Sequence, residues 1–172
     1  MRYTLLFCIL IYALSNSTLV NATDQMKESV SIGDGNFSFY GYPLEQLVSD
    51  SEFHEIYNVS PECSGAWRGY QGRWLILVDV LYLRYLIKDP CGFGSSEVEA
   101  FDLKKLFPEY NEFKDALKAD WFSGEIVIPI SESKYVEGRK TSTGHTYSEH
   151  EVLVYVIENG NVKDRKIETR ER

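Results

Sequence analysis

The sequence is poor in the residue patterns from which catalytic and metal sites are commonly built. Only three of its 172 residues are histidines, and it contains no His-Glu-x-x-His, Cys-x-x-Cys or Gly-x-Ser-x-Gly pattern. His145 and His150 lie an odd number of positions apart in a polar stretch, so on a strand they would point to opposite faces. Gly92-Phe-Gly-Ser-Ser lacks the lysine of a phosphate-binding loop. We therefore predict no catalytic set, no metal and no cofactor, and a protein without enzymatic activity.

Positive charge is also scarce. Eighteen lysines and arginines stand against 26 acidic residues, which gives a net charge of -8 and a pI near 4.9. Nucleic acids and anionic membranes are bound by clustered basic side chains, so neither is an expected partner. An acidic surface suits plain solubility, and it also suits a basic protein partner that is attracted over long range.

The sequence has no apolar run long enough to span a bilayer, which takes roughly 20 residues. The run from Leu5 to Leu14 follows Arg2 and precedes small residues that end at Ala22, as in a secretory signal peptide. An uncleaved anchor is the alternative. We predict a signal peptide at residues 1–22, a single mature domain at residues 23–172 without a stable membrane span, and export to the periplasm or the medium.

Two cysteines remain after the signal segment, Cys63 and Cys91. Export to an oxidising compartment predicts that they form a disulfide. A reactive thiol is the alternative.

Residues 63–87 dominate the fold prediction. They hold two of the three tryptophans and the longest apolar run of the mature chain, rich in β-branched and aromatic residues that favour strands. The run forms either a hairpin that turns at Asp79 or one long bent strand. Residues 152–157 predict a second buried strand, and Asn159-Gly160 after it is a typical hairpin turn.

Helical spacing is limited to two short segments. Apolar positions between Leu44 and Tyr57 fit a short amphipathic helix, and a second helix is predicted from Glu109 to Lys118. The polar ends, residues 23–35 and 168–172, are expected to be a flexible N-terminal arm and a flexible C-terminal tail. The predicted class is α+β and β-rich, with a single antiparallel sheet or a small barrel-like sandwich and one or two short helices.

Several segments between residues 63 and 162 resemble a family of small uncharacterised bacterial proteins. The segments are Trp67-Arg-Gly-Tyr70, Gly72-Arg-Trp74, Leu81-Tyr-Leu83, Leu106-Phe-Pro108, Ala119-Asp-Trp-Phe-Ser-Gly124 and Ile126-Val-Ile-Pro129. The resemblance implies a bacterial source and a single β-rich domain, and it implies no catalytic residues.

The candidate binding residues come from two of these segments: Trp67, Arg68, Tyr70, Trp121 and Phe122. Aromatic side chains and arginine are the residues that protein interfaces favour, so together they would form a recognition patch. Alternatively, Arg68 stacks on its aromatic neighbours and pairs with Asp120, which would make the cluster purely stabilising.

Asp120 and Glu125 suggest a competing function. They flank Trp121 and Phe122, and two carboxylates beside an aromatic platform can hydrolyse a glycoside. The simpler interpretation is that Asp120 ends a helix and Glu125 faces outward on a strand. We expect an exported acidic binding protein of inhibitor or immunity type with a basic partner, with an exported cell-wall or carbohydrate hydrolase, or a structural envelope protein, as alternatives.

Overall fold

The computed structural model describes residues 25–60, 63–88, 90–91, 99–110, 116–140 and 146–171. The signal peptide prediction lies outside these residues, as does His145. The described strands are β1 (Glu28–Ile32), β2 (Gly35–Phe39), β3 (Tyr70–Leu77), β4 (Val80–Lys88), β5 (Leu117–Lys118), β6 (Gly124–Pro129), β7 (Lys134–Lys140), β8 (Thr146–Glu158) and β9 (Asn161–Glu171). The helical elements are α2 (Asp50–Tyr57) and three 3-10 turns: η1 (Pro43–Gln46), η2 (Ser64–Ala66) and η3 (Leu103–Lys105).

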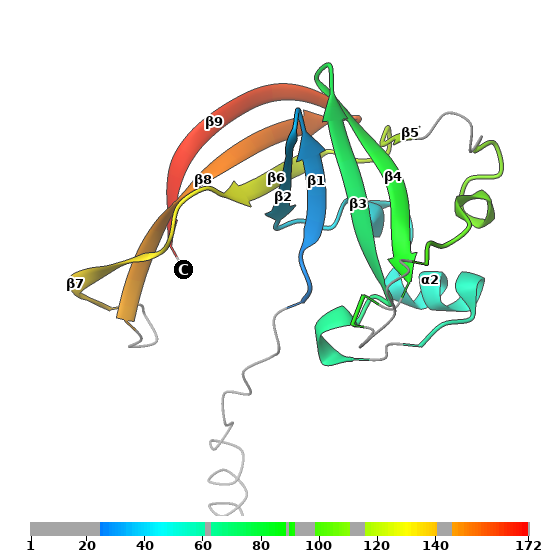
Figure 1. Cartoon of the computed structure of the whole chain (residues 1–172), viewed down its shortest axis with the longest axis horizontal. Coiled ribbons are helices and arrows are strands. Elements are labelled where there is room, and N and C mark those ends of the chain that lie inside the picture. Colours follow the sequence, from blue (N-terminus) through cyan, green and yellow to red (C-terminus); the bar gives the residue numbers. More distant parts are fainter. Residues whose placement is uncertain are drawn as a thin grey trace, which may run out of the picture.

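The nine described strands belong to one strongly curved sheet in the order β2-β1-β3-β4-β9-β8-β6, with β5 beside β4 and β7 beside β8 (Figure 1). A bridge between Tyr40 and Val127 brings the chain just after β2 next to β6, so the sheet curls toward closure but stays open. The β-rich α+β class, with one sheet and short helices, is confirmed. The sheet is mixed instead of antiparallel because β1 runs parallel to β3.

The predicted flexible N-terminal arm is wrong for most of its length. β1 lies inside the sheet, paired with β2 on one side and β3 on the other. Its side chains alternate, and those of Glu28 and Val30 are completely buried. Even before the strand, the Met26 N–H donates to the Gly65 carbonyl at 2.6 Å. A strand hydrogen-bonded on both edges cannot move as an arm.

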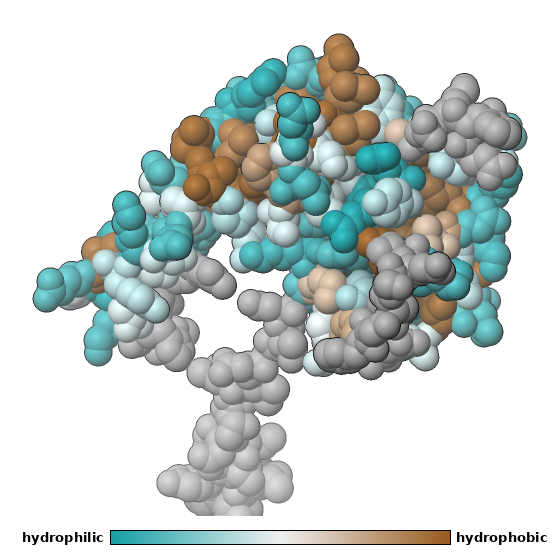
Figure 2. Space-filling view, viewed as in Figure 1, coloured by the Kyte–Doolittle hydropathy of each residue, from teal (hydrophilic) through white to brown (hydrophobic). Residues whose placement is uncertain are grey.

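The central apolar run forms the hairpin alternative, with β3 and β4 joined at Val78 and Asp79. Both turn residues have positive φ, 49° and 56°, as in the turns that match strand twist. Neither is a glycine, and a β-branched residue in this region costs about 1–2 kcal/mol. Leu77 and Val78 are nevertheless exposed, at 55% and 86%, and Figure 2 shows hydrophobic atoms at the end of this hairpin.

The predicted hairpin at Asn159-Gly160 is confirmed between β8 and β9. The predicted flexible C-terminal tail is wrong, because β9 continues to Glu171 and pairs with β8 as far as Glu149. Charged side chains did not prevent strand formation here, since they can point into solvent while the backbone is paired.

The helix predictions are confirmed in part. The segment from residue 44 to 57 contains η1 and α2, and α2 begins at a capping box between Ser49 and Glu52. The helix predicted from residue 109 to 118 is wrong at its end, where Leu117 and Lys118 form β5 and pair with β4. Residues 111–115 lie outside the described residues. Pairing with a neighbouring strand outweighed the local helical spacing.

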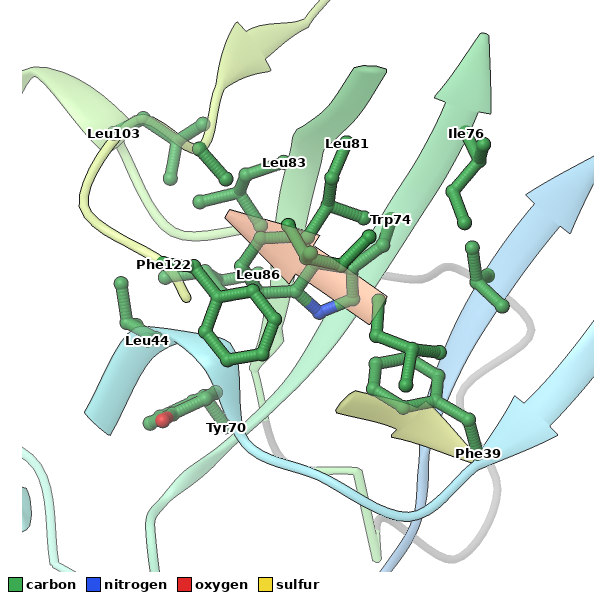
Figure 3. Packing of buried hydrophobic residues seen from close by; sticks show 14 of the residues in the cluster. Phe39, Leu44, Tyr70, Trp74, Ile76, Leu81, Leu83, Leu86, Leu103 and Phe122 are labelled. Carbon is green, nitrogen blue, oxygen red and sulfur yellow. The ribbon is translucent and has the colours of Figure 1, made fainter. Parts of the chain in front are cut away.

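The core is centred on Trp74, whose indole is 1% exposed and lies among Leu81, Leu83, Leu86 and Phe122 (Figure 3). A smaller cluster of Val127, Val152 and Val154 forms a second core. The predicted disulfide between Cys63 and Cys91 is confirmed. Among the described residues, no helix is both long and apolar enough to cross a membrane.

Candidate functional site

Arg68 lies in the interior, at the point where η2 leads into β3, and it is only 3% exposed. Its Nη2 donates to the Met26 carbonyl at 2.9 Å, and its Nη1 lies 3.5 Å from a carboxylate oxygen of Glu45. Its guanidinium carbon lies 3.5 Å from the centre of the Tyr42 ring. This packing corresponds to the stabilising alternative for Arg68, with Tyr42 and Glu45 as the partners.

Glu28 lies beside Arg68 and is completely buried. The Trp74 indole N–H donates to one of its carboxylate oxygens. Burial raises the pKa of Glu28 to about 7, because the loss of water around the carboxylate outweighs the Trp74 hydrogen bond and the attraction of Arg68. Gly72 leaves the room for this contact, since a Cβ there would overlap both the carboxylate and the indole.

Three buried polar atoms of this cluster have no hydrogen-bond partner among the described residues: Glu28 Oε1, Arg68 Nε and Tyr70 Oη. Burial also raises the pKa of Tyr70, so its hydroxyl keeps its proton. An acid that titrates near neutrality, beside a guanidinium and a phenol, has the composition of a proton-transfer site. In this conformation the three groups are buried and out of reach of a substrate. Their contacts instead hold β1 and η1 against the start of β3.

The predicted Arg68–Asp120 pair is wrong, although Tyr70 and Phe122, one from each segment behind the candidate patch, belong to the same core cluster. Asp120 pairs instead with Lys118 at 2.7 Å. Both segments contact the region of η1. Arg68 contacts Tyr42 and Glu45, as described above, whereas the Trp121 indole N–H donates to the Pro43 carbonyl at 3.1 Å.

Gln46 completes this arrangement. Its amide nitrogen donates to the Ser123 carbonyl at 2.8 Å, and its amide oxygen accepts from the Ser123 N–H at 3.0 Å. The turn that contains η1 is therefore held by residues from two distant parts of the chain.

The recognition patch predicted from the sequence is divided between interior and surface. Arg68, Tyr70 and Phe122 are buried, at 3%, 1% and 4% exposure. Trp121 is partly buried and stacks on Phe107 with ring centres 5.0 Å apart. Trp67 is 58% exposed, so it is the member of the set that presents a large surface to a partner.

A hollow of about 330 Å³ lies beside the end of η2, and its wall includes Ala66 and Gly69, which flank the Trp67-Arg68 pair in the sequence. The rest of the wall mixes polar and apolar residues: Asn58, Val59, Ser60, Lys88, Pro90, Cys91, Glu99 and Phe101. Lys88 and Glu99 pair at 3.2 Å.

The two carboxylates proposed for a hydrolase are held in separate ion pairs. Asp120 pairs with Lys118, and a carboxylate oxygen of Glu125 lies 2.6 Å from Arg170. Arg170 also contacts Glu168 at 2.6 Å. Asp120 and Glu125 are therefore paired with different cations, and Glu125 shares its arginine with Glu168.

Sequence reasoning missed Glu28, because it lies in a polar stretch. One signal was present: Glu28 shares the alternating face of β1 with Val30, which is also completely buried. An acidic residue in phase with a buried valine predicts a buried carboxylate.

Comparisons of the chain with protein-family models, with curated proteins and with solved structures found no match in any of the three.

Proposed function

We propose that this chain is an exported acidic protein that binds a basic protein partner without catalysing a reaction, and that Trp67 anchors the complex. The observation that carries the proposal is the 58% exposure of Trp67 on an immobilised backbone. Tryptophan is the residue most enriched among those that dominate binding energy.

The backbone around Trp67 is fixed before any partner arrives. The next residue, Arg68, is locked by Met26, Glu45 and Tyr42, and the Trp67 N–H itself donates to the Gln25 side chain at 3.1 Å. Because a rigid anchor loses little entropy on binding, more of its contact energy contributes to affinity.

Charge and the disulfide support the rest of the proposal. The net charge of -8 favours encounter with a basic protein. The Cys63–Cys91 disulfide fits an oxidising compartment outside the cytosol. The separate ion pairs of Asp120 and Glu125 favour binding over glycoside hydrolysis, because a catalytic pair needs one carboxyl group free to donate a proton and the other free to act as base or nucleophile.

The test is affinity capture from the exported fraction of the native host with the wild-type chain, the Trp67→Ala variant and the Tyr135→Ala variant. Tyr135 is a matched control, because it is 78% exposed on β7. We expect a basic protein that binds the wild type and the Tyr135 variant equally. The captured protein, once purified, should bind the Trp67→Ala variant about 30-fold more weakly than the wild type, which is the loss typical of a central anchor residue.

Two further measurements sharpen this test. Binding should weaken as salt is added, because charge attraction is screened. If the protein is of inhibitor or immunity type, the activity of the captured protein should fall when the chain is added. Equal binding by the Trp67 variant would refute the anchor, and recovery of no basic protein would refute the proposed partner class.

A further inference from the structure

β9 has one edge that is largely unpaired. It pairs with β8 along its whole length, but its backbone contacts on the other side are with the β3–β4 hairpin at its first residues: Asn161 lies opposite Val80, and the Val162 N–H donates to the Asp79 carbonyl at 2.8 Å. Further along, Arg165 reaches back to Asp79 with its side chain, at 2.9 Å. No strand among the described residues covers this second edge from Lys163 onward. In Figure 1, β9 forms the outer arch of the sheet. An open strand edge presents backbone donors and acceptors that can pair with another strand.

We propose that this edge pairs antiparallel with β9 of a second copy of the chain, with the two-fold axis at Ile167. A two-fold interface brings the same strand of both copies together in reverse order. Lys166 of each copy then lies opposite Glu168 of the other, and Asp164 lies opposite Arg170. Each opposite-charge pair occurs twice.

The order of charges selects this register. With the axis moved to Lys166, Asp164 would lie opposite Glu168, which places like charges together. With the axis moved to Glu168, Lys166 would lie opposite Arg170, again with like charge. Like charges directly opposite each other are unfavourable in a sheet, whereas opposite charges and apolar pairs stabilise it.

The charged side chains that this register pairs include a row on one face of β9, in which Arg170 is also held by Glu125 of β6. Lys166 contacts Glu168 at 3.0 Å and Glu168 contacts Arg170 at 2.6 Å, so the three lie on one face of the strand. A second copy would extend this row of alternating charges across the axis. The side chains of Asp164 and Lys166 are exposed, and Glu168 and Arg170 are partly exposed.

Ile167 gives the interface an apolar centre. It is 64% exposed although its register partner on β8, Leu153, packs against the main core. Over the arch of β8 and β9, Figure 2 shows a hydrophobic patch within a mostly hydrophilic surface. In the dimer each Ile167 side chain packs against the other and is removed from water, which is favourable. In a monomer, an exposed edge strand is usually protected by charged residues and not by an isoleucine.

The test measures the molar mass of the full chain by sedimentation equilibrium from micromolar to near-millimolar concentration. We expect a reversible dimer that weakens with salt. Ile167→Asp and Ile167→Lys each place like charges at the axis, so each variant alone should dissociate at least tenfold more readily. An equimolar mixture of the two variants should form heterodimers, because the axis then joins opposite charges.

Ile130→Asp is the matched control, because Ile130 is also exposed, at 44%, but lies just after β6. It should dimerise like the wild type, and circular dichroism should confirm that every variant is folded. A wild type that is monomeric throughout refutes the proposal. Ile167→Asp that dimerises unchanged, or a mixture that stays monomeric, refutes the two-fold axis at Ile167.

Discussion

Burial of Glu28 makes the stability of the protein depend on pH in an unusual direction. The side chain is completely buried, and its pKa is raised from 4.5 to about 7 on folding. A carboxyl group with a raised pKa is more readily protonated in the folded chain than in the unfolded chain. Its contribution to stability is therefore complete below pH 4.5 and is lost as the pH rises through about 7.

The size of the effect follows from the two pKa values. The change from 4.5 to about 7 corresponds, at about 1.4 kcal/mol per unit, to a loss of about 3 kcal/mol in the free energy of unfolding. The charged groups that face Glu28 are Arg68, which lowers its pKa, and Glu45, which raises it. Burial also raises the pKa of Glu45, so its titration acts in the same direction.

The perturbation that isolates Glu28 is Glu28→Gln, which keeps the shape of the side chain and an oxygen that accepts from Trp74 but removes the titration. Urea unfolding should show equal stability of wild type and variant below pH 4.5. Above pH 7 the variant should be more stable by about 3 kcal/mol, because its amide is never ionised in the core.

Glu132→Gln serves as the control, because Glu132 is exposed and its variant should keep the wild-type dependence on pH. The reasoning is refuted if the difference between wild type and Glu28→Gln is the same at both ends of this pH window. A wild type that gains stability relative to the variant as the pH rises would also contradict it.

Two further variants test the fold. Val78→Asn should raise the free energy of unfolding by about 1 kcal/mol, because asparagine tolerates the left-handed conformation (φ 49°) and the valine side chain, 86% exposed, contributes little packing. Thermal unfolding measures this, and an unchanged or lower midpoint would argue against strain at this turn. Replacing both Cys63 and Cys91 by serine should lower the free energy of unfolding by roughly 3–4 kcal/mol, because the disulfide closes a loop with a sequence separation of 28. Urea unfolding measures the loss, and a smaller value would indicate residual structure in the unfolded chain.

Turns could be predicted from the sequence where the residues of the turn themselves favour its backbone conformation. The Asn159-Gly160 dipeptide predicted its hairpin because both residues tolerate positive φ. The turn at Val78 and Asp79 was harder to predict, since neither residue is a glycine and the hairpin depends on pairing between β3 and β4.

Features that depend on distant partners could not be predicted in the same way. Arg68 was identified as a residue of interest, but its contacts with Glu45 and Met26 follow from the path of the chain through η1 and β1. The parallel pairing of β1 with β3 has no local signature either. For the candidate patch, composition identified aromatic residues correctly but could not separate exposed Trp67 from buried Phe122, because side-chain exposure is set by the assembled sheet.

The parallel position of β1 has a consequence for the order of assembly. A chain synthesised or transported with its N-terminus leading presents β1 and β2 first, yet Val30 pairs with Trp74, which emerges much later. The second edge of β1 cannot be paired, and Glu28 cannot be buried against Trp74, until β3 is in place. Between pH 4.5 and about 7, burial of the Glu28 carboxylate against β3 requires it to take up a proton. The rate at which β1 and β3 pair should therefore depend on pH.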